Sequence, residues 1–259
     1  MKEFKKIKKC AIRAAKQAGD YALKHVGKIR QIEHKSGENN LVTDVDKSCE
    51  RAIVEAIKKE FPNHSILAEE GSGRETESPI KWIIDPLDGT TNYAHGFPFF
   101  CVSIAVAFGD KVMIGIVYDP SKKEFFSAEQ GKGAFLNKKR IFVSKLRSVK
   151  ESLIATGFAY DEQGKIANIG HFEKMLKNAQ AIRRAGSAAI DLCYVAAGRF
   201  DGFWELGLSP WDTAAGQLIL IEAGGTITML DGEPFDVFKK ELVASNGVIH
   251  KEMLFLLKG

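Results

Sequence analysis

Apolar positions recur every three to four residues at the start of the chain, which predicts one long amphipathic helix over residues 3–26. A second helical repeat follows Thr43, a residue able to cap it, with Asp46 three positions further on in a capping-box arrangement. Pro62 marks the end of this second helix. Between the two repeats, the polar stretch 30–40 predicts a mobile loop.

Short apolar runs replace the helical repeat beyond Pro62 and predict strands, two of which form a hairpin across Gly109-Asp110. These strands are expected at residues 65–68, 81–85, 99–108, 111–118, 124–127, 134–136 and 152–156. The later part of the chain alternates between helix and strand. The elements expected there are helix 166–178, strand 180–183, helix 187–197, strand 200–204, helix 212–223 and strand 225–229. Sheets flanked by helices predict an α/β or α+β fold.

The length of 259 residues is sufficient for one large domain or two tightly joined halves. We expect a single domain over residues 1–259, with an N-terminal half of about 1–145 and a C-terminal half of about 150–259. A soft boundary falls near residues 144–152, where nothing resembles a flexible tether.

Composition and charge exclude several classes of protein. A net charge of +4, with 45% hydrophobic and 27% charged residues, is ordinary for a soluble protein and does not indicate a nucleic-acid partner. The four cysteines show no paired spacing, which favours free thiols in a reducing compartment. No secretory signal is evident, and the longest apolar stretch, 99–108, is too short to span a bilayer. We therefore expect a cytoplasmic protein with no membrane contact.

The most informative segment runs from Trp82 to Asn92 and reads WIIDPLDGTTN. It predicts a buried strand that ends in two carboxylates, Asp85 and Asp88. Carboxylates this close repel each other, and a hard divalent cation such as Mg²⁺ removes that cost. The Gly-Thr-Thr turn behind them offers backbone N–H groups that suit phosphate. Together these features predict metal-assisted hydrolysis of a phosphate ester.

Further acidic residues stand at the ends of predicted elements, where functional groups concentrate. Glu69-Glu70 follows a strand, Asp44 and Asp46 open the second helix, and Asp212 opens a later one. Asp46 and Asp212 have an alternative interpretation as helix caps, and Glu69-Glu70 as an exposed turn. Sequence spacing alone does not place these residues in one site.

The chain resembles the inositol monophosphatase family in several motifs that occur in the family's order. They are Leu41-Val42-Thr43-Asp44-Val45-Asp46, Glu69-Glu70, the run Trp82 to Tyr93, Pro210-Trp211-Asp212 and Glu222-Ala223-Gly224-Gly225. The resemblance implies a layered α-β-α-β-α sandwich, a homodimer and sensitivity to lithium. It also implies two or three Mg²⁺ ions, held by Glu69, Asp85, the carbonyl of Leu87, Asp88 and Asp212.

The resemblance implies catalytic roles for Asp46, Thr90 and Glu69, with Thr90 and Asp46 orienting the attacking water and helping to deprotonate it. Since a metal would do much of the acidification, Asp46 needs no raised pKa. Substrate contacts are implied for the phosphate-side residues Asp88, Gly89 and Thr90. On the C-terminal side, they are expected from Gly186, Ser187, Ala188 and Glu205, with Arg184 as a candidate cation. Gly186-Ser187 can alternatively be a simple helix cap.

The expected activity is hydrolysis of myo-inositol 1-phosphate or a related sugar or polyol phosphate. The alternatives are a fructose-1,6-bisphosphatase, alone or as a dual activity using Arg183 or Arg184, a histidinol phosphatase, and a non-catalytic phosphate-binding regulator. A nucleotide 3′-phosphatase is disfavoured because no purine-stacking insertion is evident. The loop 33–40, with Lys35, is a candidate mobile cover over the site. The six histidines show no metal-ligand spacing, and we assign none of them a catalytic role.

Overall fold

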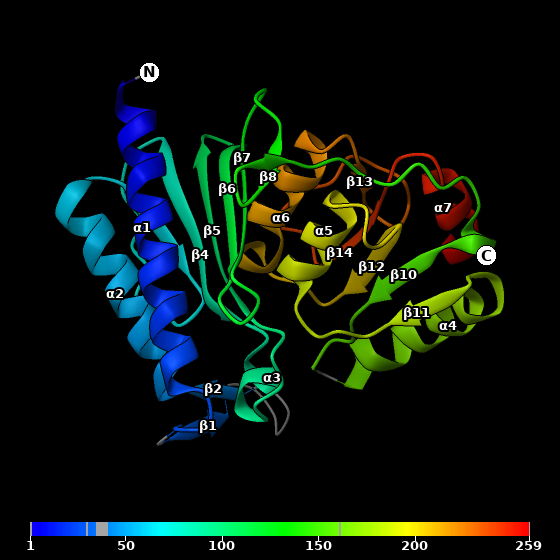
Figure 1. Cartoon of the computed structure of the whole chain (residues 1–259), viewed down its shortest axis with the longest axis horizontal. Coiled ribbons are helices and arrows are strands. Elements are labelled where there is room, and N and C mark those ends of the chain that lie inside the picture. Colours follow the sequence, from blue (N-terminus) through cyan, green and yellow to red (C-terminus); the bar gives the residue numbers. More distant parts are fainter. Residues whose placement is uncertain (1, 30, 35–40, 161, 259) are drawn as a thin grey trace.

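The computed structural model describes residues 2–29, 31–34, 41–160 and 162–258. Helices and sheets alternate in layers from one side of the molecule to the other (Figure 1). This arrangement confirms the α-β-α-β-α sandwich expected from the family resemblance. Within the described ranges, no helix is long and apolar enough to cross a membrane.

The first layer consists of helices α1 (Lys2–His25) and α2 (Asp44–Glu60), which cover one face of a seven-stranded sheet (Figure 1). Thr43 caps α2, and Asp46 completes the capping box, as predicted. The strands of this sheet lie in the order β3-β4-β5-β6-β7-β8-β9. Their bounds are β3 (Ser65–Ala68), β4 (Ile80–Asp88), β5 (Cys101–Phe108), β6 (Lys111–Asp119), β7 (Glu124–Glu129), β8 (Ala134–Leu136) and β9 (Lys139–Arg140).

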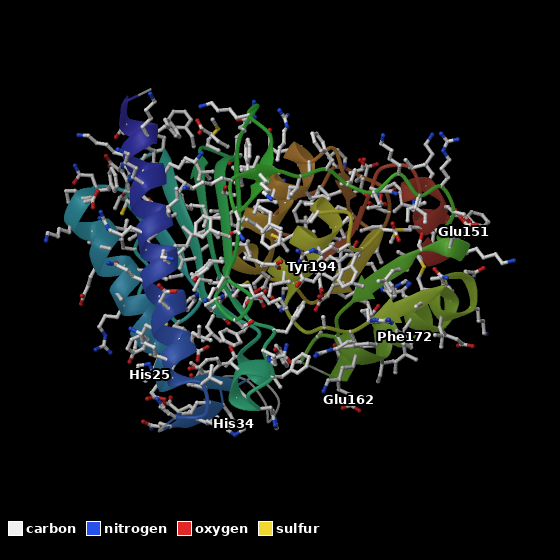
Figure 2. All side chains as sticks on the ribbon, in the orientation of Figure 1. His25, His34, Glu151, Glu162, Phe172 and Tyr194 are labelled. Carbon is white, nitrogen blue, oxygen red and sulfur yellow. The ribbon has the colours of Figure 1, made fainter. Side chains whose placement is uncertain are left out.

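The central layer consists of α5 (Ala188–Ala196) and α6 (Pro210–Glu222), which lie between the two sheets. Every residue of α5 is buried, as expected for a helix covered on all sides. Helix α6 lies close against β6 because Gly115 has no side chain, and a Cβ there would stand 2.5 Å from the carbonyl oxygen of Ala215. Figure 2 shows Tyr194 of α5 in the interior, where its ring meets Phe99 edge-on at 5.8 Å.

The second sheet has five strands in the order β11-β10-β12-β14-β13, and α4 and α7 cover its outer face (Figure 1). Its strands are β10 (Leu153–Thr156), β11 (Ala181–Arg183), β12 (Gly202–Leu206), β13 (Thr226–Thr228) and β14 (Glu241–Ser245). The outer helices are α4 (Glu162–Asn178) and α7 (His250–Lys258). A short helix α3 (Thr90–Ala94) and a 3₁₀ turn (Val149–Glu151) complete the described elements.

The structure differs from the sequence-based expectation between α1 and α2. Part of the predicted loop 30–40 is a strand, β1 (Ile32–His34), which pairs antiparallel with β2 (Leu41–Thr43). The residues of β1 are exposed, so no alternation of apolar and polar positions reveals the strand. Residues 35–40, with Lys35 of the expected mobile cover, lie outside the described part of the chain.

Candidate active site

The end of β4 carries the central carboxylates, and the strand runs three residues further than predicted. It continues to Asp88, with a shift of register against β5 between Asp85 and Asp88. Pro86 lies in this segment and has no N–H to donate to a neighbouring strand. It is therefore compatible with the register shift, which changes the direction of the following side chains. Gly89 then adopts a φ of 92°, in a position where a Cβ would lie 2.8 Å from the carbonyl oxygen of Phe99.

A pocket of about 650 Å³, partly open to solvent, lies at this point and collects residues from both halves of the chain. Glu69 enters from the end of β3, Asp85 and Asp88 from β4, and Asp212 from the start of α6. Of the residues predicted for the site, those lining the pocket are Glu69, Asp85, Leu87, Asp88, Gly89, Thr90, Arg184, Gly186, Ser187, Ala188, Glu205 and Asp212. Asp46 does not line the pocket.

Hydrogen bonds from the chain orient three of the pocket carboxylates. Oδ1 of Asp85 accepts from the N–H of Leu87 at 2.9 Å, and Oδ2 of Asp212 accepts from that of Ser209 at 2.7 Å. Oδ2 of Asp88 accepts from the hydroxyl of Ser187 at 2.5 Å and from the N–H of Ala189 at 2.8 Å. These bonds fix the rotamers, as outer partners do at metal sites.

Burial and mutual repulsion raise the pKa values of these carboxyl groups. Burial is the main cause of the raised pKa values of Asp85 and Asp212, and the charge of Glu69 adds to both. Burial also raises the pKa of Asp88 to about 6, against the opposing effect of the Ser187 hydrogen bond. A cation in the pocket would reverse this preference for the protonated forms.

The donor set is chemically suited to a hard divalent cation, because it consists of carboxylate and carbonyl oxygens. Among the described residues, no three or more acidic, histidine or cysteine side chains already form a cage around one point. None of the histidines in the described ranges lines the pocket.

Asp46 and Thr90 meet although they lie on different elements. The hydroxyl of Thr90 donates to Oδ1 of Asp46 at 2.9 Å, and the N–H of Thr43 donates to Oδ2 at 2.9 Å. Asp46 thus serves as a helix-capping residue and as the partner of Thr90 at once. Burial raises the pKa of Asp46 to about 6, although the hydrogen bonds from Thr43 and Thr90 oppose the shift. The structure therefore gives Asp46 the raised pKa that the sequence argument did not require.

Glu50 is a buried acidic residue that the sequence analysis missed. It lies one helical turn after Asp46 on α2, is fully buried, and accepts from the N–H groups of Glu70 at 2.6 Å and Ser72 at 2.8 Å. These bonds hold the turn that begins at Glu69. The sequence offered only one indication of this role: Glu50 lies four residues after Asp46, on the same face of the predicted helix.

Asn92 joins the two halves of the pocket. Its Nδ2 atom donates to the carbonyl oxygens of Phe99 at 2.8 Å and Ala185 at 2.9 Å. It thereby fixes the turn before Ser187, which caps α5 and also donates to Asp88. Ser187 therefore caps α5, as the helix-cap interpretation predicted, and Gly186 and Ser187 also line the pocket.

The C-terminal wall of the pocket carries Glu205 and Arg184. Burial raises the pKa of Glu205 to about 8, and the nearby positive charge of Arg184 opposes this shift. Arg183 does not line the pocket, whereas Arg184 does, and the guanidinium of Arg183 donates to the carbonyl oxygen of Ile182 at 3.0 Å.

Several pocket residues had no signal in the sequence, because they follow strand ends without acidic or glycine-rich motifs. They are Gly157, Phe158, Ala159, Tyr160, Gly207 and Leu208, and Leu41, the first residue of β2, lines the pocket as well. Most of them surround Glu205 and Arg184.

Comparison with known proteins identifies the family. The sequence profile of the inositol monophosphatase family matches residues 3–257. The chain is 46% identical over 229 residues to an inositol-1-monophosphatase of Synechocystis sp., covering 88% of this chain and 80% of that protein. It is 43% identical over 248 residues to the Nus factor SuhB of Haemophilus influenzae, covering 94% and 92%.

Solved structures agree with this result. An IMPase of Thermotoga maritima superimposes with a TM-score of 0.89 at 38% identity, covering 100% of this chain and 97% of that one. An IMPase/NADP phosphatase in complex with Mg²⁺ and phosphate superimposes with a TM-score of 0.85 at 28% identity, covering 97% and 95%. The chain therefore belongs to the inositol monophosphatase family.

Proposed function

We propose that this chain is a Mg²⁺-dependent phosphomonoesterase that hydrolyses myo-inositol 1-phosphate or a related sugar or polyol phosphate. The observation that carries the proposal is the convergence of Glu69, Asp85, Asp88 and Asp212 on one pocket, with the Thr90–Asp46 pair at its wall. Family membership and the Mg²⁺ and phosphate bound by a related phosphatase support it.

Two or three Mg²⁺ ions would be held by Glu69, Asp85, Asp88, Asp212 and the carbonyl of Leu87, all of which line the pocket. When bound, the ions supply positive charge that acidifies water and neutralises the phosphate ester. The hydrogen bonds to Asp85, Asp88 and Asp212 prepare this set by engaging one oxygen of each carboxylate.

Thr90 and Asp46 would position the attacking water. Because the hydroxyl of Thr90 donates to Asp46, its lone pairs can accept from water at the pocket wall. Asp46, with a pKa of about 6, can take up a proton through that hydroxyl near neutral pH. Glu69 would share in orienting the water, since it lines the pocket together with Thr90.

The phosphate and the alcohol of the substrate would occupy adjoining parts of the pocket, because Ser187 on the alcohol side donates to Asp88 on the phosphate side. Backbone N–H groups of Gly89 and Thr90 would hold phosphate oxygens beside Asp88. Hydroxyl groups of the alcohol would reach Glu205 and the turn formed by Gly186, Ser187 and Ala188, with Arg184 beside them.

Phosphate release from a panel of phosphate esters, with Mg²⁺ and with EDTA, tests the proposal. The parent protein is expected to hydrolyse inositol and sugar phosphates only with Mg²⁺. Asp88→Asn should lower kcat by about a hundredfold or more, because it removes a charge needed in the transition state, while the circular dichroism spectrum stays unchanged. Parental turnover by this variant would overturn the assignment.

A bisphosphate substrate is the second candidate, because Arg184 lines the pocket and can meet a second phosphate. If fructose 1,6-bisphosphate is a substrate, Arg184→Ala should raise its KM more than that of inositol 1-phosphate. Arg183→Ala is the matched control, since Arg183 is exposed and lies outside the pocket lining. Equal effects of both variants on both substrates would argue against the bisphosphate.

Inhibition by lithium and a homodimer remain proposals drawn from the family resemblance. Both can be measured directly. Turnover in the presence of LiCl tests the first, and light scattering coupled to size-exclusion chromatography tests the second.

A further inference from the structure

The carboxylate of Glu205 lies directly against the backbone of Gly157. A Cβ built onto Gly157 would overlap both carboxylate oxygens and Cδ of Glu205. The backbone of Gly157 does not lie in the left-handed region, so space and not conformation requires glycine here. Both residues line the pocket. Any side chain at position 157 would therefore push Glu205 out of its place.

Strand register explains why these two residues meet. Strands β10 and β12 run parallel, and Thr156 stands opposite Trp204 at the last pair of the ladder. Gly157 and Glu205 are the next residue along each strand. The position of the Glu205 carboxylate thus depends on how the ends of these two strands are held together.

A single buried amide on α4 ties these ends together. Nδ2 of Asn168 donates to the carbonyl oxygen of Gly157 at 2.6 Å and to the hydroxyl of Thr156 at 3.2 Å. Its Oδ1 accepts from Nε1 of Trp204 at 2.7 Å. Asn168, Thr156 and Trp204 are all fully buried, so these bonds do not compete with water.

The same helix also supports the next residue of the pocket wall. Phe158 lines the pocket, and its ring packs at 5.8 Å from that of Phe172, which lies one turn after Asn168 on α4. Figure 2 shows Phe172 on the side of α4 that faces this part of the sheet. Helix α4 therefore supports the pocket from outside, without lining it.

We propose that Asn168 is a positioning residue, and Gly157 a specificity-determining residue, for the part of the pocket that receives the hydroxyl groups of the substrate. This inference rests on the proposed function, in which Glu205 accepts hydrogen bonds from the alcohol. Asn168 holds the ends of β10 and β12 together, and Gly157 leaves room for the carboxylate of Glu205. Glu205 then binds the hydroxyl groups of the substrate.

The first test compares two substrates, myo-inositol 1-phosphate and p-nitrophenyl phosphate, which has no sugar hydroxyls. Gly157→Ala should lower the ratio of kcat/KM for the first over the second by about tenfold or more, mainly through KM, because the hydrogen-bonding carboxyl group of Glu205 is misplaced. Asn168→Asp keeps the acceptor for Trp204 and loses the donor to Gly157, so the same ratio should fall by about threefold to tenfold.

A matched control lies on the same helix. Asn178 is exposed and donates only within α4, to the carbonyl oxygen of Lys174 at 2.8 Å. Asn178→Asp should leave the substrate ratio unchanged. A purely structural role of Asn168 would lower both activities together and would leave the ratio at its parental value, which would overturn the proposal.

A double-mutant cycle with Glu205→Ala makes the test specific. In that background no carboxylate stands against residue 157, so Gly157→Ala should change the substrate ratio by less than about twofold. An equal loss with and without the Glu205 carboxylate would contradict the proposal, even if Gly157→Ala alone behaved as expected.

Failure of the proposed function can be told apart from failure of this inference. A parent protein that does not prefer the inositol ester refutes the substrate, and the cycle is then repeated with the best hydroxyl-bearing ester of the panel. Binding of free myo-inositol with inorganic phosphate, measured by calorimetry, gives a readout independent of turnover. Unaltered myo-inositol affinity in Gly157→Ala, beside weakened affinity in Glu205→Ala, would overturn the inference alone.

Discussion

The hydroxyl of Thr90 donates a 2.9 Å hydrogen bond to Oδ1 of Asp46, a residue 44 positions earlier in the chain. Asp46 opens α2 on the outer side of the seven-stranded sheet, and Thr90 opens the short helix that follows the end of β4. Their contact joins the first helical layer to the pocket. It also connects the hydroxyl of Thr90, which lines the pocket, to a buried carboxylate.

The Thr90–Asp46 contact predicts that the hydroxyl, and not the shape of the side chain, matters for turnover. Thr90→Val keeps the volume and removes the hydroxyl, and we expect kcat to fall by about 10²–10⁴-fold with saturating Mg²⁺. Thr90→Ser keeps the hydroxyl and should stay within about tenfold of the parent. Phosphate release measures both. Turnover by Thr90→Val at the level of Thr90→Ser would exclude the relay.

Glu50 is expected to support metal binding without touching the metal. Because it accepts from the N–H groups of Glu70 and Ser72, Glu50→Gln loosens the turn that carries Glu69. Calorimetry should show Mg²⁺ affinity weakened by about 10–100-fold, the usual effect of losing such a supporting contact. Glu55→Gln, at an exposed position of the same helix, is the control. Equal affinity in the two variants would refute this role.

In its ionised form, Asp88 is expected to destabilise the metal-free protein. Its folded-state pKa of about 6 exceeds the ordinary 3.8, so the folded state favours the protonated carboxyl group. The stability that the protonated group contributes is present below pH 4 and is lost as the pH rises through 6. In EDTA at pH 7.5, Asp88→Asn should therefore melt a few degrees above the parent, corresponding to about 1–3 kcal/mol. The difference should vanish near pH 4. A variant that melts below the parent at pH 7.5 would contradict this expectation.

His250 gives the opposite dependence on pH. Its ring lies between the hydroxyls of Ser245 and Thr228, each at 3.0 Å, and burial lowers its pKa below 6.5. Its contribution to stability is thus present above pH 6.5 and is lost as the pH falls below that value. Between pH 7 and pH 5, Tm of the parent should fall more steeply than Tm of His250→Gln.

The control for this prediction is His34→Gln, because His34 lies exposed on β1. It should follow the parent over the same pH range. If His250→Gln and His34→Gln show the same slope of Tm against pH, the buried imidazole is not the titrating group.

The acidic residues of the site were predictable because each stands at the end of an element with a clear periodicity. Asp85 and Asp88 end an apolar strand, and Asp46 and Asp212 stand in the first turns of helices, where local rules also favour carboxylates. The capping roles of Asp46 and Asp212 are confirmed, and beside them Asp212 lines the pocket and Asp46 accepts from Thr90. The sequence could not decide whether these aspartates cap helices or belong to the pocket, because in the structure the two roles do not exclude each other.

Elements without such periodicity escaped the sequence analysis. Strand β1 is exposed and has only three residues, so no pattern marks it. Asn168 lies within α4, where its amide resembles any polar helix residue until Trp204 and Gly157 are seen to surround it. Glu50 was hidden for the same reason, since its two donors belong to a turn on another element.

The sequence by itself determined most of the helices and strands up to residue 229, the family motifs and the oxygen-rich chemistry of the acidic residues, because these follow from local periodicity and side-chain type. Only the tertiary structure decided which of these residues meet. Strand register brings Gly157 against Glu205, and the end of β4 lies beside α2 and α5, so that Thr90 meets Asp46 and Asp88 meets Ser187. These contacts arise from the packing of distant segments, which no local pattern specifies.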